Sequence, residues 1–229
     1  MADDLIDSIP TSRYGHRQGG MNHPMTDVPH KSQTKLLDAT LKVVRTKGYN
    51  ATRVEDVCAA AGVTKGSFFH HFESKDDLAL AAAAHWRDHA KAIFAEAPYN
   101  KVADPFDRLL AYLDFRKSML TGELKDYTCF AGTVIQETYA THPQLRDACE
   151  QSIAEHAASL TPMIAAAMRK YRVKSGWPAR SLALHTQAVL QGAFILAKAQ
   201  GQARVAAESI DHLRRYLELL FGRHGGKRS

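Results

Sequence analysis

The stretch Val54–Phe72, VEDVCAAAGVTKGSFFHHF, decides the fold expected for the N-terminal part of this chain. It predicts a helix, a tight turn at Gly62, where glycine accepts a left-handed backbone, and a second short helix. Thr64 can cap the second helix by accepting hydrogen bonds from its first free amides. The apolar residues of the first helix recur at helical spacing and form one buried face: Val54, Val57, Cys58 and Ala61.

The second helix of this motif divides into an inner and an outer face. Phe68 and Phe72 are four residues apart, so we expect them to point inward rather than stack on bases. The outward residues are small, cationic or able to hydrogen-bond, with one aromatic ring among them: Lys65, Gly66, Ser67, Phe69 and His70. A short helix with such a face suits the major groove of DNA.

Helical periodicity continues through the rest of the chain, without a convincing strand or internal repeat. Further helices are expected over about 32–48, 74–97, 105–120, 129–140, 143–171, 179–200 and 204–221, which makes about nine helices in all. The fold class is therefore all-α. We expect residues 32–76 to form a three-helix, helix-turn-helix DNA-binding domain and residues 77–229 to form a helical ligand-binding and dimerisation domain. Residues 1–31 lack apolar periodicity and are expected to be a disordered arm.

Composition bounds the partners and the compartment. The formal net charge of +6 favours a polyanionic partner, although an ordinary basic protein accounts for it as well. Three cysteines form no disulfide framework and indicate a reducing compartment. The longest uncharged run, Ser181–Ala197, is too short and too polar to span a bilayer, and no signal peptide is recognised. We expect a soluble, cytoplasmic protein with no membrane partner and no cofactor.

The run TKGYNATRVEDVCAAAGVTKGSFFHHFESKDDLALA resembles the N-terminal signature of the TetR/AcrR family of bacterial transcriptional regulators. In that family a first helix ends in Lys-Gly-Tyr/Phe, a Thr begins the second helix, Gly-Val-Ser/Thr precedes the third, and Tyr-x-His/Tyr-Phe-x-x-Lys follows. The resemblance covers roughly residues 33–82. Phe69 departs from the family pattern, which most often has Tyr there, so one hydroxyl–phosphate hydrogen bond is missing and His70 becomes the nearer polar contact.

The resemblance implies DNA contacts that the chemistry of the residues allows. Thr52 and Arg53 would bind phosphate through hydroxyl, amide and guanidinium groups. The segment Thr64–Ser67 would enter the major groove, with Lys65 at a guanine edge or a phosphate and Gly66 allowing close backbone approach. His70 and Lys75 would hold flanking phosphates. Two such modules must stand about one turn of DNA apart, ~34 Å, to read a near-palindromic double-stranded operator, so a homodimer is implied.

The last two expected helices are the natural dimer element. The final helix has a stripe at steps of three and four residues: Ala206, Ile210, Leu213, Leu217 and Leu220. The helix before it offers a facing set: Leu184, Ala188, Gln191, Phe194 and Ile195. Paired across a two-fold axis, such helices form a four-helix bundle. The alternative is that both stripes pack inward within one chain.

Residues 77–200 are expected to bind a small-molecule inducer. The inducer would favour a conformation in which the spacing of the two DNA-binding domains does not fit the operator. Apolar walls with a few polar groups suit a cavity, and an ordinary core with polar edges is the alternative. The candidate ligand-binding residues are Trp86, Tyr112, Phe115, Cys129, Gln136 and His185. Cys129 lies early in a helix, where the dipole lowers a thiol pKa; it is either an electrophile or oxidant sensor or a buried, inert thiol.

Other functional classes remain as alternatives. His85 and His89 have the spacing of a metal pair, but a third ligand is missing, so no metal site is expected. A helical di-iron enzyme needs Glu-x-x-His pairs, and the sequence contains none, nor a phosphate loop or nucleophile elbow. We therefore expect no catalytic residues. A ligand-independent architectural DNA-binding protein would not need the long C-terminal half, and saturable release of DNA by a small molecule would separate the two.

Overall fold

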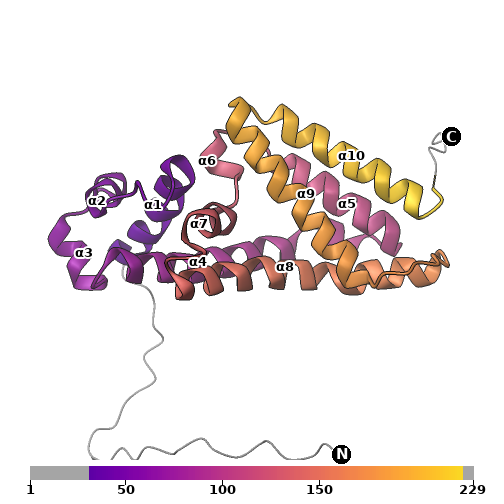
Figure 1. The fold of residues 1–229 in the computed structure, drawn as a ribbon, viewed down its shortest axis with the longest axis horizontal. Coiled ribbons are helices and arrows are strands. Elements are labelled where there is room, and N and C mark those ends of the chain that lie inside the picture. The colour runs from indigo at the N-terminus through magenta and orange to yellow at the C-terminus, as the bar shows by residue number, and fades with distance from the viewer. Residues whose placement is uncertain (1–30, 224–229) are drawn as a thin grey trace, which may run out of the picture.

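The computed structural model describes residues 31–223, and this part of the chain is all-helical, which confirms the predicted fold class. Figure 1 shows the first three helices grouped at one end of an elongated molecule and the last two toward the other end. The expected disordered arm lies, except for Lys31, outside the described residues. Within residues 31–223 no helix is long and apolar enough to cross a membrane.

The described residues form ten α-helices and one short 3-10 helix. In chain order they are α1 Lys31–Lys47, α2 Val54–Ala61, α3 Lys65–His71, α4 Lys75–Glu96, η1 Pro98–Lys101, α5 Pro105–Ser118, α6 Leu124–Tyr127, α7 Phe130–Thr138, α8 Pro143–Lys170, α9 Ala179–Gln200 and α10 Arg204–Leu220. The sequence analysis missed η1 and α6. Each has four residues, which is too short for an apolar period to show.

Local signals set where the helices begin. The hydroxyl of Ser74 accepts a hydrogen bond from the Asp77 amide at 3.0 Å and begins α4. The Asp104 carboxylate accepts from two amides at 2.8 and 2.9 Å and begins α5, with Pro105 in the first turn. Both arrangements satisfy amides that an N-terminal turn leaves without an intrahelical partner.

The helices pack around two main hydrophobic cores. The first joins α1–α4 to α7 and the start of α8, and its fully buried side chains include Leu36, Val57, Phe68, Leu78 and Phe130. The second joins α5, α8, α9 and α10, and includes Leu109, Leu113, Ile164, Leu190 and Leu217. Helix α4 packs on α1 and on α8, so it connects the two halves of the molecule.

Arg45 makes the principal polar junction between α1 and the rest of the chain. Its side chain is buried, and Nε donates to the Leu41 carbonyl at 2.9 Å. Nη1 donates to the carbonyl of Asp126, in α6, at 3.2 Å and to that of Thr128, between α6 and α7, at 3.3 Å. The guanidinium carbon also lies 5.1 Å from the ring centre of Trp86 on α4. The end of α1 is thereby fixed to two other elements.

A second junction lies just beyond α1. The amide of Asn50 donates to a carboxylate oxygen of Glu137, on α7, at 2.7 Å. Gly48 has φ +88°, and a Cβ there would lie 2.2 Å from the same carboxylate group. Glycine is therefore required at this position both by the backbone conformation and by the close approach of α7.

Candidate nucleic-acid interface and buried cavity

The turn between α2 and α3 has the geometry that its sequence predicts. Gly62 adopts the left-handed conformation with φ +65°, and its amide donates to Ala59 while that of Val63 donates to Cys58, at 3.2 and 3.0 Å. The Thr64 hydroxyl accepts from the Ser67 amide at 3.1 Å. This turn fixes α3 relative to α2 and presents its N-terminal end at the surface.

The outer face of α3 is open to solvent. Phe68 and Phe72 are buried as expected, whereas Phe69 is 58% exposed. Lys65, Gly66 and His70 are exposed and Ser67 is half-buried. Lys65 makes an ion pair with Glu55 on α2 at 2.5 Å, and this pair is exposed at both ends. Because exposed ion pairs contribute little, Lys65 can leave Glu55 for a phosphate or a base at small cost.

The phosphate contacts expected at the start of α2 need correction. Thr52 is buried, and its hydroxyl donates to the Gly48 carbonyl at 2.5 Å, so that hydroxyl does not face outward. The Arg53 amide donates to the Asp56 carboxylate at 2.7 Å. Of the three groups named for this position, only the exposed guanidinium of Arg53 remains available.

Lys75 lies at the start of α4, beside the same surface. Its Nζ donates to the Tyr49 carbonyl at 3.3 Å and lies 4.2 Å from the Tyr49 ring centre. An ammonium group has three donors, so this tether positions the cation and leaves donors for a phosphate.

The second candidate site is a pair of adjoining cavities inside the C-terminal half. The smaller, about 100 Å³, lies between α4, α5, α8, α9 and the α6–α7 segment. The larger, about 840 Å³, lies between α4, η1, α5 and α8. Phe94 and His156 line both. Pro162, inside α8, lines the larger cavity together with Ala158, whose carbonyl the proline cannot bond in the usual helical pattern.

Two family models match separate parts of this chain. Residues 36–82 match the model described as bacterial regulatory proteins, tetR family, and residues 105–213 match the tetracyclin repressor-like C-terminal domain. Together the two models match more than half of the chain. The protein belongs to the TetR family. It is a transcriptional regulator with a helix-turn-helix DNA-binding domain.

Individual relatives match this chain over different lengths. An HTH-type regulator of Lactococcus lactis is 25% identical over 82% of this chain and 93% of its own length. The transcriptional repressor KstR2 of Rhodococcus jostii is 40% identical over 57 residues, which cover 24% of this chain and 28% of that protein. The solved structure of a TetR regulatory protein from Rhodobacter sphaeroides has a TM-score of 0.73 at 21% identity, covering 82% of this chain and 99% of that one.

Four of the six candidate ligand residues of this TetR-family chain are at or behind the cavity. Trp86 and Cys129 line the smaller cavity directly. Tyr112 is fully buried behind its wall, with its hydroxyl 2.9 Å from Nε2 of His156. Phe115 packs edge-on against Phe94 at 5.9 Å between ring centres. Whether these residues bind a ligand stays a prediction.

The structure contradicts the placement of the other two. Gln136 is exposed, and its side chain donates to the Gly132 carbonyl of its own helix at 2.9 Å. His185 is also exposed and packs against the Tyr216 ring of α10. Both were assigned to the wrong side of their helices, because the sequence predicts a helix more reliably than the direction in which each side chain points.

The sequence analysis also missed four polar residues that line the smaller cavity: Arg116, His156, Gln187 and Gln191. Arg116 follows Tyr112 by four residues on α5, so helical spacing from a candidate already named could have found it. Of the pair considered for a metal, His85 has its Nε2 2.8 Å from a carboxylate oxygen of Asp38. Among residues 31–223 there is no cluster of three potential metal ligands.

His156 gives a testable pH dependence. Burial and then the nearby Arg116 guanidinium lower the pKa of His156 to about 3. In the unfolded chain the imidazole takes up a proton near pH ~6.5, so between these values the unfolded state binds one more proton. Stability should therefore fall as pH falls, by about 1.4 kcal/mol per pH unit. Denaturant unfolding between about pH 7 and 5 should show this loss, reduced in His156→Gln.

The exposed His70 on α3 provides the control, because His70→Gln changes an imidazole outside both cavities. This variant should keep the pH dependence of the parent. An equal loss of stability in the parent and in His156→Gln would show that the buried imidazole is not the group responsible.

Proposed function

We propose that this TetR-family protein is a dimeric repressor that binds a near-palindromic operator and leaves it when a small molecule enters the smaller cavity. The observation that carries the proposal is the Arg45 junction. The Asp126 and Cys129 side chains line that cavity, and Arg45 bonds the Asp126 and Thr128 carbonyls to the last turn of α1 in the DNA-binding head. A ligand in the cavity would thus act on the same segment that positions the DNA-binding domain.

Repression is favoured by the name of a relative and by the small number of contacts that it requires. KstR2 of Rhodococcus jostii, which is 40% identical over 57 residues, is named a transcriptional repressor. A head on an operator blocks access to the DNA without any further contact, whereas activation needs a surface for the transcription machinery. Release by a ligand then requires only that the ligand binds more tightly to the conformation that fits the operator less well.

In the proposed complex the exposed residues divide by role. Arg53, His70 and Lys75 hold phosphates, and Lys65 exchanges Glu55 for DNA. Thr64, Gly66 and Ser67 lie in the major groove, where the absence of a side chain at Gly66 allows the backbone to approach the base edges. Phe69 contributes apolar contact in place of a hydroxyl.

The roles of Lys75 and Ser67 predict different mutational effects. Lys75→Ala should weaken binding of every operator sequence alike and lower the slope of log affinity against log salt by about 1, because one phosphate contact is lost. Ser67→Ala should change the preference among base-substituted operators and leave the salt slope unaltered. Fluorescence anisotropy with a set of operators at several salt concentrations measures both. Lys101→Ala, at an exposed lysine in η1, is the control. A loss confined to one base position would instead give Lys75 a base-reading role.

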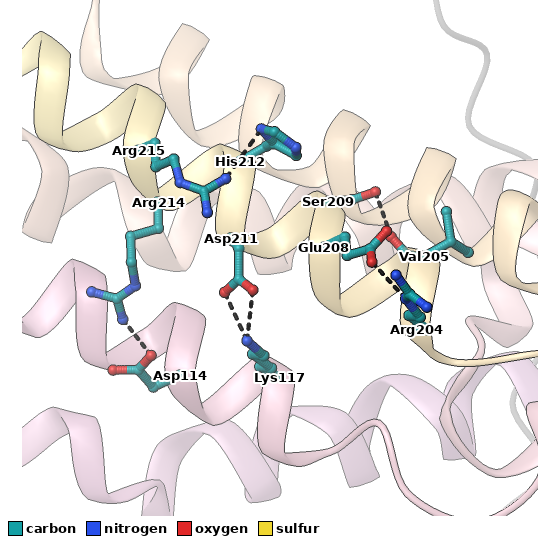
Figure 2. Close-up of polar contacts among 10 residues, drawn as sticks. All are labelled: Asp114, Lys117, Arg204, Val205, Glu208, Ser209, Asp211, His212, Arg214 and Arg215. Atoms are coloured by element: carbon teal, nitrogen blue, oxygen red, sulfur yellow. Dashed lines mark hydrogen bonds and ion pairs between the residues drawn. The ribbon is translucent and has the colours of Figure 1, made fainter.

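The dimer surface needs correction, because the α10 stripe is already used within the chain. Ala206, Ile210, Leu213 and Leu217 are all buried. Figure 2 shows the reason: Asp211 and Arg214 point from α10 toward α5, where they pair with Lys117 and Asp114. Gln191 and Phe194 of α9 likewise point inward, to the cavity. The buried members of the two stripes therefore pack within one chain, which leaves Leu184, Ala188 and Ile195 of the predicted facing set exposed.

The opposite faces of the same two helices are apolar and exposed. On α9 they carry Leu184, Ile195 and Leu196, each between 44% and 48% exposed. On α10 they carry Tyr216 and Leu219, which are 41% and 62% exposed. In Figure 2, His212 and Arg215 project on the side of α10 away from α5. Exposed apolar residues on adjacent helices mark a contact surface, and we assign the two-fold interface of the dimer to them.

Leu219→Glu should convert the dimer to monomers, because it places two charges at the centre of a desolvated contact. Size-exclusion chromatography with light scattering measures the mass, and operator affinity should fall with it, since one head reads only half of the site. Tyr139→Glu is a matched control, because Tyr139 is 64% exposed but lies at the end of α7. A dimer that survives in Leu219→Glu would place the interface elsewhere.

Cys129 supports a second mode of release, by covalent reaction with an electrophile. Its thiol lines the smaller cavity, and its sulfur accepts the Gly132 amide at 3.3 Å at the N-terminal end of α7. Cys58 and Cys149 are buried, and burial raises the pKa of both thiols, that of Cys149 to about 12. Of the three cysteines, which all lie within residues 31–223, Cys129 alone lines this cavity.

Treatment with N-ethylmaleimide should therefore modify Cys129 first, as mass spectrometry of peptides would show. The adduct should release the operator from the parent protein but leave Cys129→Ser bound. Equal release from both proteins, or none from the parent, would remove the covalent mode. Titration of uncharged and charged small molecules against the protein–operator complex tests the non-covalent mode, which requires that such a molecule releases the operator.

A further inference from the structure

We propose that the smaller cavity is a site for a small organic anion, a monocarboxylate with an apolar body, and that Arg116 binds its carboxylate. This inference rests on the proposed function in one respect: it names the chemical class of the molecule that enters the cavity. It adds a residue and a charge requirement that neither the fold nor the family supplies.

The first support is the state of Arg116 itself. Its guanidinium lies between two aromatic rings, 5.2 Å from the centre of Phe94 and 5.7 Å from that of Phe194. It also acts on the hydroxyl of the buried Tyr112, whose pKa is raised by burial and partly lowered by Arg116. Among residues 31–223 no carboxylate lies within ion-pair distance of it, whereas the next residue, Lys117, pairs with Asp211 at 2.7 Å. A half-buried guanidinium without a counter-ion is costly, and a ligand carboxylate would supply one.

The second support is the neutrality of the groups around it. The lowered pKa of His156 keeps its imidazole uncharged, and its Nε2 lies 2.9 Å from the Tyr112 hydroxyl. The Gln187 amide donates to that hydroxyl at 3.4 Å, and Gln191 also lines the cavity. One fixed cation among uncharged donors matches a single negative charge, because a second charge on the ligand would find no partner.

The acidic residue at the cavity does not change the preference for a negatively charged ligand. Asp126 also lines the smaller cavity, but it is exposed. Its carboxylate accepts the amide of Glu123 at 2.9 Å, at the start of α6. A solvated carboxylate that is already engaged at a helix terminus repels an anionic ligand only weakly. The half-buried guanidinium of Arg116 attracts the same ligand more strongly.

The walls define the rest of the ligand. Apart from the polar groups, the smaller cavity is lined by Trp86, Ile93, Phe94, Met119, Ile153 and Phe194. Its volume, about 100 Å³, has room for several waters or for a body of benzene size. The carboxylate of such a molecule would meet Arg116, and its apolar body would lie against the aromatic walls, in the usual division of small-molecule sites. Arg is suited to this role because its planar fork binds a carboxylate through two parallel hydrogen bonds.

The test compares acids with amides of the same shape. Calorimetry measures the binding of three acids to the purified full-length protein: benzoate, phenylacetate and hexanoate. The corresponding amides, benzamide, phenylacetamide and hexanamide, are titrated in the same way. At least one acid should bind tenfold or more tightly than its amide, and Arg116→Gln should remove that preference while leaving the affinity of the amide unchanged. Arg116→Lys, which keeps the charge but not the fork, should retain part of it.

Two controls exclude trivial causes. Arg87→Gln neutralises a cation that lines the larger cavity and contacts Asp88 and Gln151; it should keep the full preference for the acid. Circular dichroism and operator binding of each variant report on folding. Arg116→Gln should still bind the operator, because α5, which carries Arg116, lies away from α3 (Figure 1).

The outcomes separate this proposal from the function on which it rests. Equal binding of acids and amides, a preference that survives in Arg116→Gln, or no binding by any of the three acids would overturn the anion site. If the amides alone bind and release the operator, the repressor function stands and the anion site falls. If an acid binds through Arg116 but never releases the operator, the site stands and the proposed release falls.

Discussion

The hydrogen bonds of Arg45 to main-chain carbonyls are the constraint on which the relation between the two halves depends. The carbonyls of Asp126 and Thr128 belong to the α6–α7 segment, and a buried guanidinium from α1 supplies their donor. Hydrogen bonds to a charged group contribute about 1.5–3 kcal/mol each, and a buried carbonyl left without its donor costs a similar amount. The DNA-binding head is therefore held to the cavity wall by a few strong, directional contacts in addition to the apolar core that α1–α4 share with α7 and the start of α8.

This attachment has the right size for a switch. Coupling between two sites typically amounts to about 1–3 kcal/mol, the range of a single hydrogen bond of this kind. The second junction, from Asn50 to Glu137, holds the chain just beyond α1 to α7. Because both junctions end on the segment from Asp126 to Glu137, a displacement of that segment moves the head as a body. A ligand beside Trp86 and Cys129 needs to disturb only one Arg45 bond to change the spacing of two heads.

The sequence was sufficient for the head because its signals are local. Gly62 and Thr64 set the turn through their own backbone and hydroxyl, and the structure confirms both. The cavity is different, since its lining comes from five helices whose rotation depends on their neighbours. Gln136 and His185 were placed on the wrong faces for this reason. Thr52 was misjudged because a hydroxyl that suits a phosphate equally suits the carbonyl of Gly48.

Helix α9 explains why occupancy and assembly are linked. Its inner face supplies Gln187, Gln191 and Phe194 to the smaller cavity, and its outer face carries Leu184 and Ile195. The second set forms part of the proposed two-fold contact. A close-packed helix cannot adjust one face alone, because its side chains interlock on both sides. In the proposed dimer, a ligand that moves α9 would therefore act on the two-fold contact as well as on the Arg45 segment. Both would set the distance between the two DNA-binding domains, so a small displacement at the cavity would reach the operator by two routes.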